Sequence, residues 1–312
     1  MAQGDSSRRR GGWIPGMAGA PAFTLATPDS APIPILIAAP HGGRSYPATV
    51  LGKMRKPAQS TLRLEDRYAD LLAQEVARAT GAGLLIAHAP RAMIDLNRAV
   101  EDMDWSMIRR SALSLARPAP QGGRRARSGL GLVPRRLSGV GEIWSRLLEQ
   151  RELEGRIEGI HRPYHETLAA HLRDLRSEWG AALLLDLHSM PPLGLRADGD
   201  QAAEFVVGDR FGAACEHALS GAAIAQLGAE GRLVAHNRPY AGGYVLDRHA
   251  APVRGIHAMQ LEVCRSAYLD SHLAEIGSGF DATVAVIVRL VQRLAGEVAA
   301  LGRGGITAQA AE

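Results

Sequence analysis

Cysteine and lysine are scarce in this sequence of 312 residues. The two cysteines, Cys215 and Cys264, are too few for a disulfide framework or a zinc ribbon, so any metal site must be built from histidines and carboxylates. We interpret both cysteines as core residues. Lysine occurs only at Lys53 and Lys56, which leaves 34 arginines among the 36 basic residues. Because arginine suits carboxylates and phosphates, this excess is consistent with an anionic ligand, although genomic composition bias can also produce it.

Aromatic residues and long apolar runs are also scarce. Aromatic residues make up 4% of the chain, whereas nucleic-acid surfaces interleave basic with aromatic side chains, so we expect no nucleic-acid partner. No stretch approaches the roughly 20 consecutive apolar residues of a membrane helix, and the N-terminus lacks the apolar segment of a secretory signal. We therefore expect no membrane partner and a cytoplasmic protein. Homo-oligomerisation stays open.

Between residues 23 and 302, short apolar runs alternate with longer helical patterns, without a repeat or a clear linker. This alternation predicts a single α/β domain with a largely parallel or mixed sheet flanked by helices. Residues 1–22 and 303–312 lack periodicity, and we expect disordered tails there. The arginine- and glycine-rich segment 117–142 predicts a long loop, and such loops often carry function.

Three apolar runs lead into polar side chains that could carry chemistry. PILIAAP precedes His41, LLLDL precedes His188, and MQLEV contains Glu262 and is followed by Arg265. Ligands of α/β sheets gather beyond the carboxyl ends of the strands, and imidazoles with a carboxylate are the parts of a catalytic zinc site. A lone histidine at a strand end is more often structural. Asp186 could orient an imidazole, or could face the other side of the strand.

Other catalytic signatures are absent: the sequence has no G-x-S-x-G elbow, Walker loop, G-x-G-x-x-G after a strand, or H-E-x-x-H. His161 and His165 lie four residues apart, a spacing that could make a metal pair on a helix. Pro163 predicts that the helix begins between them, which favours a pocket or structural role.

An asparagine followed by an arginine occurs after two of the apolar runs, at Asn97-Arg98 and at Asn237-Arg238. An amide beside a guanidinium suits a carboxylate ligand, and the second pair lies in a glycine-rich turn where a backbone can approach a ligand closely. The alternative interpretation is a surface salt bridge.

Eight segments occur together in an order that resembles the N-formylglutamate amidohydrolase family, a relative of zinc carboxypeptidases and aspartoacylases. The segments are PHGGRSYP, EDRYADLL, PRAMIDLNR, GLGLVPR, HRPYH, LLLDLHSM, NRPYAGGY and QLEVCRSAYLD, between residues 40 and 270. The resemblance implies a carboxypeptidase-like (phosphorylase/hydrolase-like) fold with a mixed twisted sheet, one zinc ion per chain, and a place in histidine degradation.

The resemblance also implies roles for individual residues. His41 and His188 would be metal ligands, and the third would be the acid at the start of the helix expected at residues 65–80, with Asp66 favoured over Glu65. Glu262 matches the general base. The related carboxypeptidases have an acidic ligand three residues after the first histidine, where this chain has Arg44. The family's common His-Ser-Gly is also His-Gly-Gly here.

Further residues complete this expected site. Asn97 and Arg98 match the pair that holds the substrate carboxylate in aspartoacylases, and Arg91 would stabilise the oxyanion. The remaining candidates for binding the substrate are Arg44, Arg238, Tyr244 and Arg265.

The expected reaction is zinc-dependent hydrolysis of an anionic N-acyl amino acid, with N-formyl-L-glutamate giving formate and glutamate as the leading candidate. One alternative is a zinc amidase or carboxypeptidase that acts on a peptide or cell-wall fragment, and a lid over the zinc formed by segment 117–142 would favour the small substrate. A second alternative is a non-catalytic or nucleic-acid-binding protein.

Overall fold

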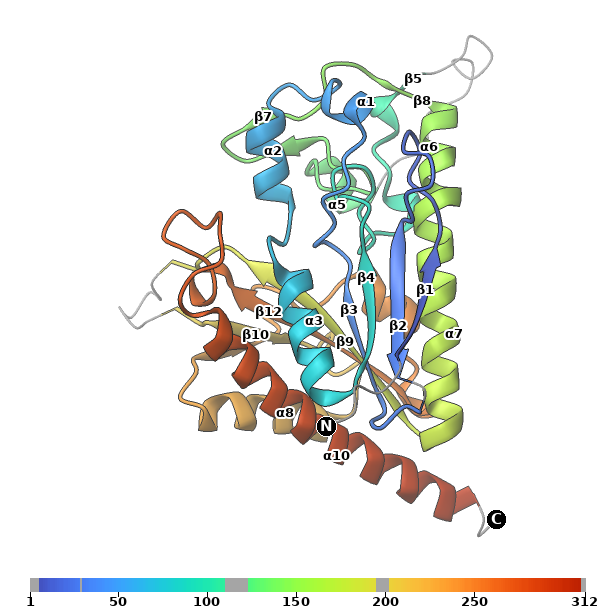
Figure 1. The fold of residues 1–312 in the computed structure, drawn as a ribbon, viewed down its shortest axis with the longest axis vertical. Helices are drawn as coiled ribbons and strands as arrows, with labels where there is room; N and C mark the ends of the chain where they lie inside the picture. Colours follow the sequence, from blue (N-terminus) through green and yellow to red (C-terminus); the bar gives the residue numbers. More distant parts are fainter. Residues whose placement is uncertain (1–5, 29, 110–122, 195–201, 310–312) are drawn as a thin grey trace.

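The computed structural model describes residues 6–28, 30–109, 123–194 and 202–309. An eight-stranded mixed sheet forms its centre (Figure 1). Neighbouring strands are parallel from β4 through β3 and β9 to β12, and from β10 to β11, and the other neighbours are antiparallel. In spatial order the strands are β1 (Ser6–Gly11), β2 (Phe23–Pro28), β4 (Gly83–Ala87), β3 (Ile35–Ala39), β9 (Ala182–Met190), β12 (Ile256–Cys264), β10 (Phe205–Gly208) and β11 (Val234–His236).

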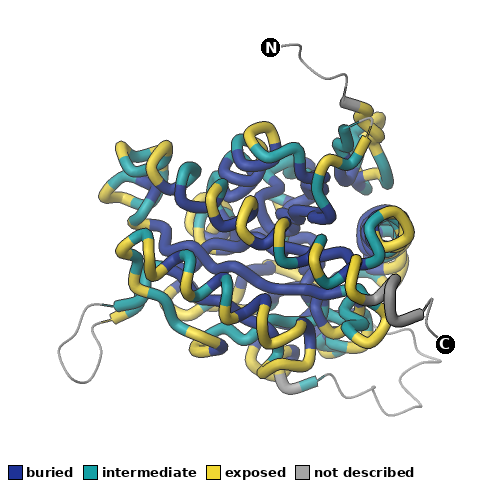
Figure 2. Tube along the Cα trace, turned by 90° about the horizontal axis from the view of Figure 1, so that it is seen from below, coloured by how far each residue is buried: buried dark blue, intermediate teal, exposed yellow. Residues whose placement is uncertain are grey.

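The central strands are continuous apolar runs because both of their faces are covered. Every residue of β3, β4 and β9 is buried. Alternate side chains enter two separate cores, so that Leu36 and Ala38 pack on one face of the sheet and Ile35 and Ile37 on the other. Figure 2 shows the strands as a buried trace between segments that are more exposed.

Helices cover both faces of the sheet, which confirms the predicted α/β architecture. On one face, α10 (Phe280–Gln309) packs against α3 (Ala69–Thr80) and α8 (His217–Ala229), and on the other α7 (Arg162–Trp179) follows α6 (Gln150–Arg156). No helix in the described ranges has the length and apolarity needed to span a membrane. The shorter elements are α1 (Ala48–Leu51), α2 (Pro57–Leu64), α5 (Arg124–Arg127), α9 (Tyr244–His249), β5 (Ile108–Arg109), β6 (Arg136–Leu137), β7 (Gly141–Glu142) and β8 (Leu148–Glu149).

The structure differs from the sequence-based expectation at the tails and at the long loop. Residues 6–11 form β1, paired with β2, because edge pairing uses backbone groups and needs no apolar pattern. At the other end α10 continues to Gln309. Residues 1–5, 310–312 and 117–122 lie outside the described ranges. Residues 123–142 include α5, β6 and β7, and Leu132 and Val133 are fully buried, so this part packs into the domain.

Asp209 directly follows β10. Its side chain connects the segments that follow β10 and β11 with helix α8. Its carboxylate accepts hydrogen bonds from Ser220 Oγ at 2.6 Å, Asn237 Nδ2 at 2.7 Å and the Gly212 backbone N–H at 2.9 Å, and it lies 2.9 Å from His236 Nε2. Burial opposes ionisation, but these bonds lower the pKa of Asp209 from 3.8 to about 2.

The variant Asp209→Asn tests this arrangement. A depressed pKa gives stability that is present above about pH 4 and lost as the pH falls toward about 2. We expect the variant to lower the free energy of unfolding at pH 7 by about 2 kcal/mol and to lack this acid-dependent loss. Urea unfolding at neutral and acidic pH measures both effects. The exposed Asp174→Asn serves as control, and equal stability of the two variants would contradict the assignment.

Candidate active site

Three neighbouring parallel strands bring the predicted histidines and Glu262 to one edge of the sheet. His41 follows β3 by two residues, His188 lies near the end of β9, and Glu262 lies near the end of β12. The β9–β12 register places Glu262 beside His188. All three residues are buried. Parallel pairing therefore brings together side chains that are far apart in sequence: His41 and Glu262 are separated by more than 200 residues.

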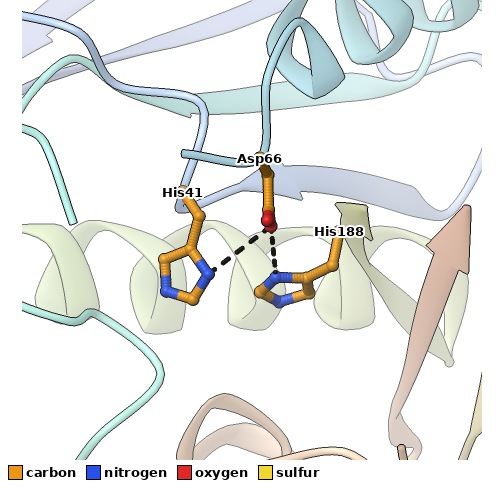
Figure 3. Close-up of side chains that lie close together, drawn as sticks. All are labelled: His41, Asp66 and His188. Carbon is orange, nitrogen blue, oxygen red and sulfur yellow. Dashed lines mark hydrogen bonds and ion pairs between the residues drawn. The ribbon is translucent and has the colours of Figure 1, made fainter. Parts of the chain in front are cut away.

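Asp66 lies between the two histidines. It belongs to the short connection between α2 and α3, because α3 begins at Ala69 and not at residue 65 as expected. Its backbone N–H donates to the His41 carbonyl at 3.0 Å, which turns the carboxylate toward the strand ends. Asp66 Oδ2 lies 2.9 Å from His188 Nδ1 and 3.5 Å from His41 Nδ1 (Figure 3). One ligand atom from each residue lies within 4.8 Å of the others.

A second carboxylate holds the far nitrogen of each imidazole. His41 Nε2 lies 2.8 Å from Asp95 Oδ1, and His188 Nε2 lies 2.9 Å from Asp186 Oδ2. When each Nε2–H donates to its aspartate, each Nδ1 is left unprotonated and faces Asp66. This is the carboxylate–histidine–metal arrangement of many metal sites.

The donor set fits a zinc ion. His41 Nδ1 is buried and has no hydrogen-bond partner in the described ranges, which is costly unless a cation binds there. Two imidazole nitrogens and one carboxylate oxygen are a common set of protein ligands for catalytic zinc, which keeps a further position open. We call His41, Asp66 and His188 the candidate metal group.

Buried charges in this group reinforce one another. Burial alone would lower the pKa of His188, but Asp186 and Asp66 raise it well above its ordinary value. Burial likewise opposes ionisation of Asp66, but the hydrogen bond from His188 and the nearby ring of His41 hold its pKa well below the ordinary range. Without a metal, a proton on His188 therefore compensates the surrounding carboxylates, and a bound cation would take its place.

A directed chain of hydrogen bonds orients Glu262. The Val245 backbone N–H donates to Asn97 Oδ1 at 2.9 Å, Asn97 Nδ2 donates to Gln260 Oε1 at 3.3 Å, and Gln260 Nε2 donates to Glu262 Oε1 at 2.7 Å. Because a backbone N–H can only donate, it sets the direction of both side-chain amides. Glu262 Oε1 is thus occupied. Burial raises the pKa of Glu262 to about 7.

The His-Gly-Gly sequence has a steric cause. A Cβ atom at residue 42 would lie 2.7 Å from the Asp70 Cβ, and one at residue 43 would lie 2.3 Å from the Ala89 carbonyl oxygen. Neither position has room for a side chain, so this chain could not carry the His-Ser-Gly variant without moving Asp70.

Three residues expected to bind substrate are already engaged within the protein. Arg44 forms a two-point ion pair with Asp70, at 2.9 and 2.8 Å. Asn97 uses both of its side-chain polar atoms in the chain described above. Arg98 donates from Nε to the Leu130 carbonyl at 2.9 Å and from Nη1 to the Asn97 carbonyl at 2.6 Å.

Arg91 and Arg265 border the candidate metal group. Arg91 Nε donates to Asp95 Oδ2 at 2.9 Å. Arg265 donates from Nε to Ser189 Oγ at 3.0 Å, and its Nη2 lies 3.5 Å from Asp66 Oδ1. Each arginine thus holds a residue of the site or one that supports it.

The other two predicted substrate residues, Arg238 and Tyr244, make no hydrogen bond or ion pair with the candidate metal group in the described ranges. Arg238 is exposed and makes no ion pair with any residue in the described ranges. The Tyr244 hydroxyl accepts a hydrogen bond from Arg248, and its ring stacks on His161 at 5.7 Å.

His161 and His165 belong to a separate, buried polar cluster. His165 Nδ1 lies 2.9 Å from His249 Nε2, and His161 Nε2 lies 2.9 Å from the Arg98 carbonyl oxygen. Within the described ranges, the candidate metal group is the only set of three residues placed to hold a metal ion. The geometry therefore favours the structural interpretation of His161 and His165.

Sequence reasoning missed three residues that the structure places in or behind the site. Asp95 orients His41, and Gln260 holds Glu262. Tyr240 is half-buried against Met190, Val206 and Cys264 at this edge of the sheet, and burial and the charges of Glu262 and Asp66 raise its pKa. An acid or amide two residues from a candidate, as in Asp186-x-His188 and Gln260-x-Glu262, is a usable signal because strand residues two apart share a face.

The fold and the site together define an α/β enzyme of the hydrolase class with a candidate metal centre. More particularly, the chain belongs to the N-formylglutamate amidohydrolase family, whose model matches residues 33–269, and it is therefore an amidohydrolase. Two relatives are N-formylglutamate deformylases. The one from Pseudomonas aeruginosa is 28% identical over 268 residues, covering 84% of this chain and 92% of the relative. The one from Pseudomonas putida is 30% identical over 240 residues, covering 76% and 82%.

Solved structures agree with this assignment. The N-formylglutamate amidohydrolase of Ralstonia eutropha JMP134 superposes with a TM-score of 0.78 at 31% identity, covering 89% of this chain and 98% of that one. A protein from Agrobacterium tumefaciens shares the fold at 18% identity, with a TM-score of 0.62 and coverage of 89% and 94%.

The variant Asp95→Asn tests whether the second carboxylate supports metal binding. Loss of the charge behind His41 should weaken zinc binding by about 10- to 100-fold, measured by competition with a chelator. Asp70→Asn is the control, because Asp70 pairs with Arg44 and makes no hydrogen bond to the candidate metal group. Unchanged zinc affinity in Asp95→Asn, or an equal loss in both variants, would contradict the role.

Proposed function

We propose that this protein hydrolyses N-formyl-L-glutamate to formate and L-glutamate, with one zinc ion held by His41, Asp66 and His188. The observation that carries the proposal is this buried group beside Glu262. The family and the names of its relatives support the substrate. We also propose a carboxypeptidase-like fold, supported by a mixed sheet whose parallel strands end at the candidate metal group.

Zinc, when bound, would polarise the formyl carbonyl and lower the pKa of a water molecule. Glu262 is the proton carrier in the proposed reaction. With Oε1 held by Gln260, its free Oε2 removes a proton from the attacking water and then passes it to the amide nitrogen as the C–N bond breaks. A carboxyl whose pKa is about 7 is suited to both steps at neutral pH. The products are formate and the free amine of glutamate.

Arg91 and Tyr240 are the proposed donors to the oxyanion that develops on the formyl oxygen. Among the described residues, Arg91 forms a hydrogen bond only from Nε, to Asp95, which leaves its terminal N–H groups for substrate. The Tyr240 phenol stays protonated at neutral pH because its pKa is raised, so it can donate. Each such donor typically contributes about 3 kcal/mol in the transition state.

The two carboxylates of the substrate require further cationic partners. Arg44, Asn97 and Arg98 are engaged with protein groups other than the candidate metal group, so we assign the carboxylates to Arg238 and to Arg265, which borders that group. Arg265 lies beside Asp66, and Arg238 is exposed in the same turn as Tyr240. This assignment replaces the aspartoacylase-like pair Asn97 and Arg98 with two arginines, because Asn237, the neighbour of Arg238, is hydrogen-bonded to Asp209.

The variant Glu262→Gln tests the proton carrier. We expect kcat for formate release to fall by about 10²- to 10⁴-fold while zinc content stays unchanged, because the amide cannot accept the proton. His188→Ala should lose zinc and activity together. Zinc-loaded wild-type protein that releases no formate from N-formyl-L-glutamate would refute the substrate, and activity in Glu262→Gln would refute the role.

The variant Gln260→Leu tests the hydrogen bond that orients Glu262. We expect kcat to fall by about tenfold or more, with KM and zinc content near the wild-type values, because a hydrogen bond to a charged group is lost. Gln226→Leu is the control, since Gln226 lies on α8 and contacts Glu230. A change in KM alone, or equal effects of the two variants, would show that Gln260 does not position Glu262.

A further inference from the structure

A cavity lies among α1, α6 and the segment near Gly16, and none of the candidate metal group or Glu262 lines it. Its volume is about 630 Å³. Four cationic side chains line it, Lys53, Arg146, Arg151 and Arg156, with one acid, Glu152. The cavity is therefore strongly basic, and the chemistry proposed above does not use it.

Arg156 is the buried cation of this cavity. Only 3% of it is exposed, and its Nη1 donates to the Met93 carbonyl at 2.9 Å while the guanidinium lies 5.6 Å from the Trp144 ring. Among the described residues, no carboxylate pairs with it. Burial, with no opposing charge, lowers its pKa to about 10. Arginines this deeply buried are normally paired with a carboxylate or another anion, so the position of Arg156 is unusual.

The other charges of the cavity are not balanced either. Lys53 pairs with Glu152. Arg146 and Arg151 make no ion pair with any described residue, and both are exposed. Burial and the neighbouring charges of Arg146 and Arg156 lower the pKa of Lys53, which indicates a positive potential. After the Lys53–Glu152 pair is set aside, three guanidinium groups have no acidic partner among the residues that the structure describes.

We propose that this cavity binds a small molecule bearing a phosphate group. Planar guanidinium groups match phosphate oxygens at two points, and three of them offset the charge of a phosphate ester. The volume falls in the roughly 300–1,000 Å³ range of ligand sites and exceeds the need of a bare ion. Val50, Met93 and Pro15 add apolar lining for the rest of the ligand.

Calorimetric titration of the purified full-length protein with inorganic phosphate, at constant ionic strength, tests the proposal. We expect the double variant Arg146→Gln/Arg151→Gln to bind about tenfold or more weakly, because it loses two charged donors that are exposed and not needed for folding. Arg156→Met should also lose binding. Arg173→Gln, an exposed arginine on α7 outside the cavity, should bind as the wild type does.

Two further titrations test whether phosphate binds in this cavity and whether the site prefers phosphate to another anion. His188→Ala should retain phosphate binding, which separates this cavity from the candidate metal group and makes the result independent of the proposed hydrolysis. Citrate should bind more weakly than phosphate. The proposal is overturned by no binding at millimolar phosphate, by unchanged binding in the double variant, by loss in His188→Ala alone, or by equal binding of citrate.

Discussion

The parallel pairing of β3, β9 and β12 is the constraint on which the candidate site depends. Each strand contributes one functional side chain at or just beyond its end, and the register between β9 and β12 sets Glu262 beside His188. A shift by one residue would turn either side chain to the opposite face of the sheet. The continuous apolar runs before these residues therefore do more than fill a core, because their packing on both faces fixes the register.

Around this edge, buried charges occur in linked sets. Asp66 lies between two imidazoles, each imidazole meets a second aspartate, and Arg91 meets one of those aspartates in turn. Each group has a partner of opposite charge or a hydrogen bond, which offsets the cost of removing it from water. The arrangement also restricts each ring to one orientation, so that the nitrogens facing Asp66 need little reorganisation when a cation binds.

The central strands, the longer helices and the histidines at strand ends could be predicted from the sequence, because hydrophobic period and polarity at the strand ends are local signals. The hydrogen bond between Asn97 and Gln260 joins residues 163 positions apart, and nothing local indicates it. The same holds for the pairing of Arg44 with Asp70, since a sequence shows where an arginine is but not which acid it meets. The strand at residues 6–11 had no apolar pattern to reveal it.

That strand, β1, also affects whether two copies of the protein can associate through the edges of their sheets. Because β1 is the outermost strand, one side of its backbone has no strand to pair with. Such an edge can pair with a strand of another molecule, and this pairing leads to aggregation. Arg8, Arg9 and Arg10 are consecutive and exposed along it, and the opposite edge, β11, has only three residues. The arginines on β1 of two copies would repel each other, and β11 is too short to pair with a long strand. Both edges of the sheet therefore disfavour pairing with the sheet of another copy.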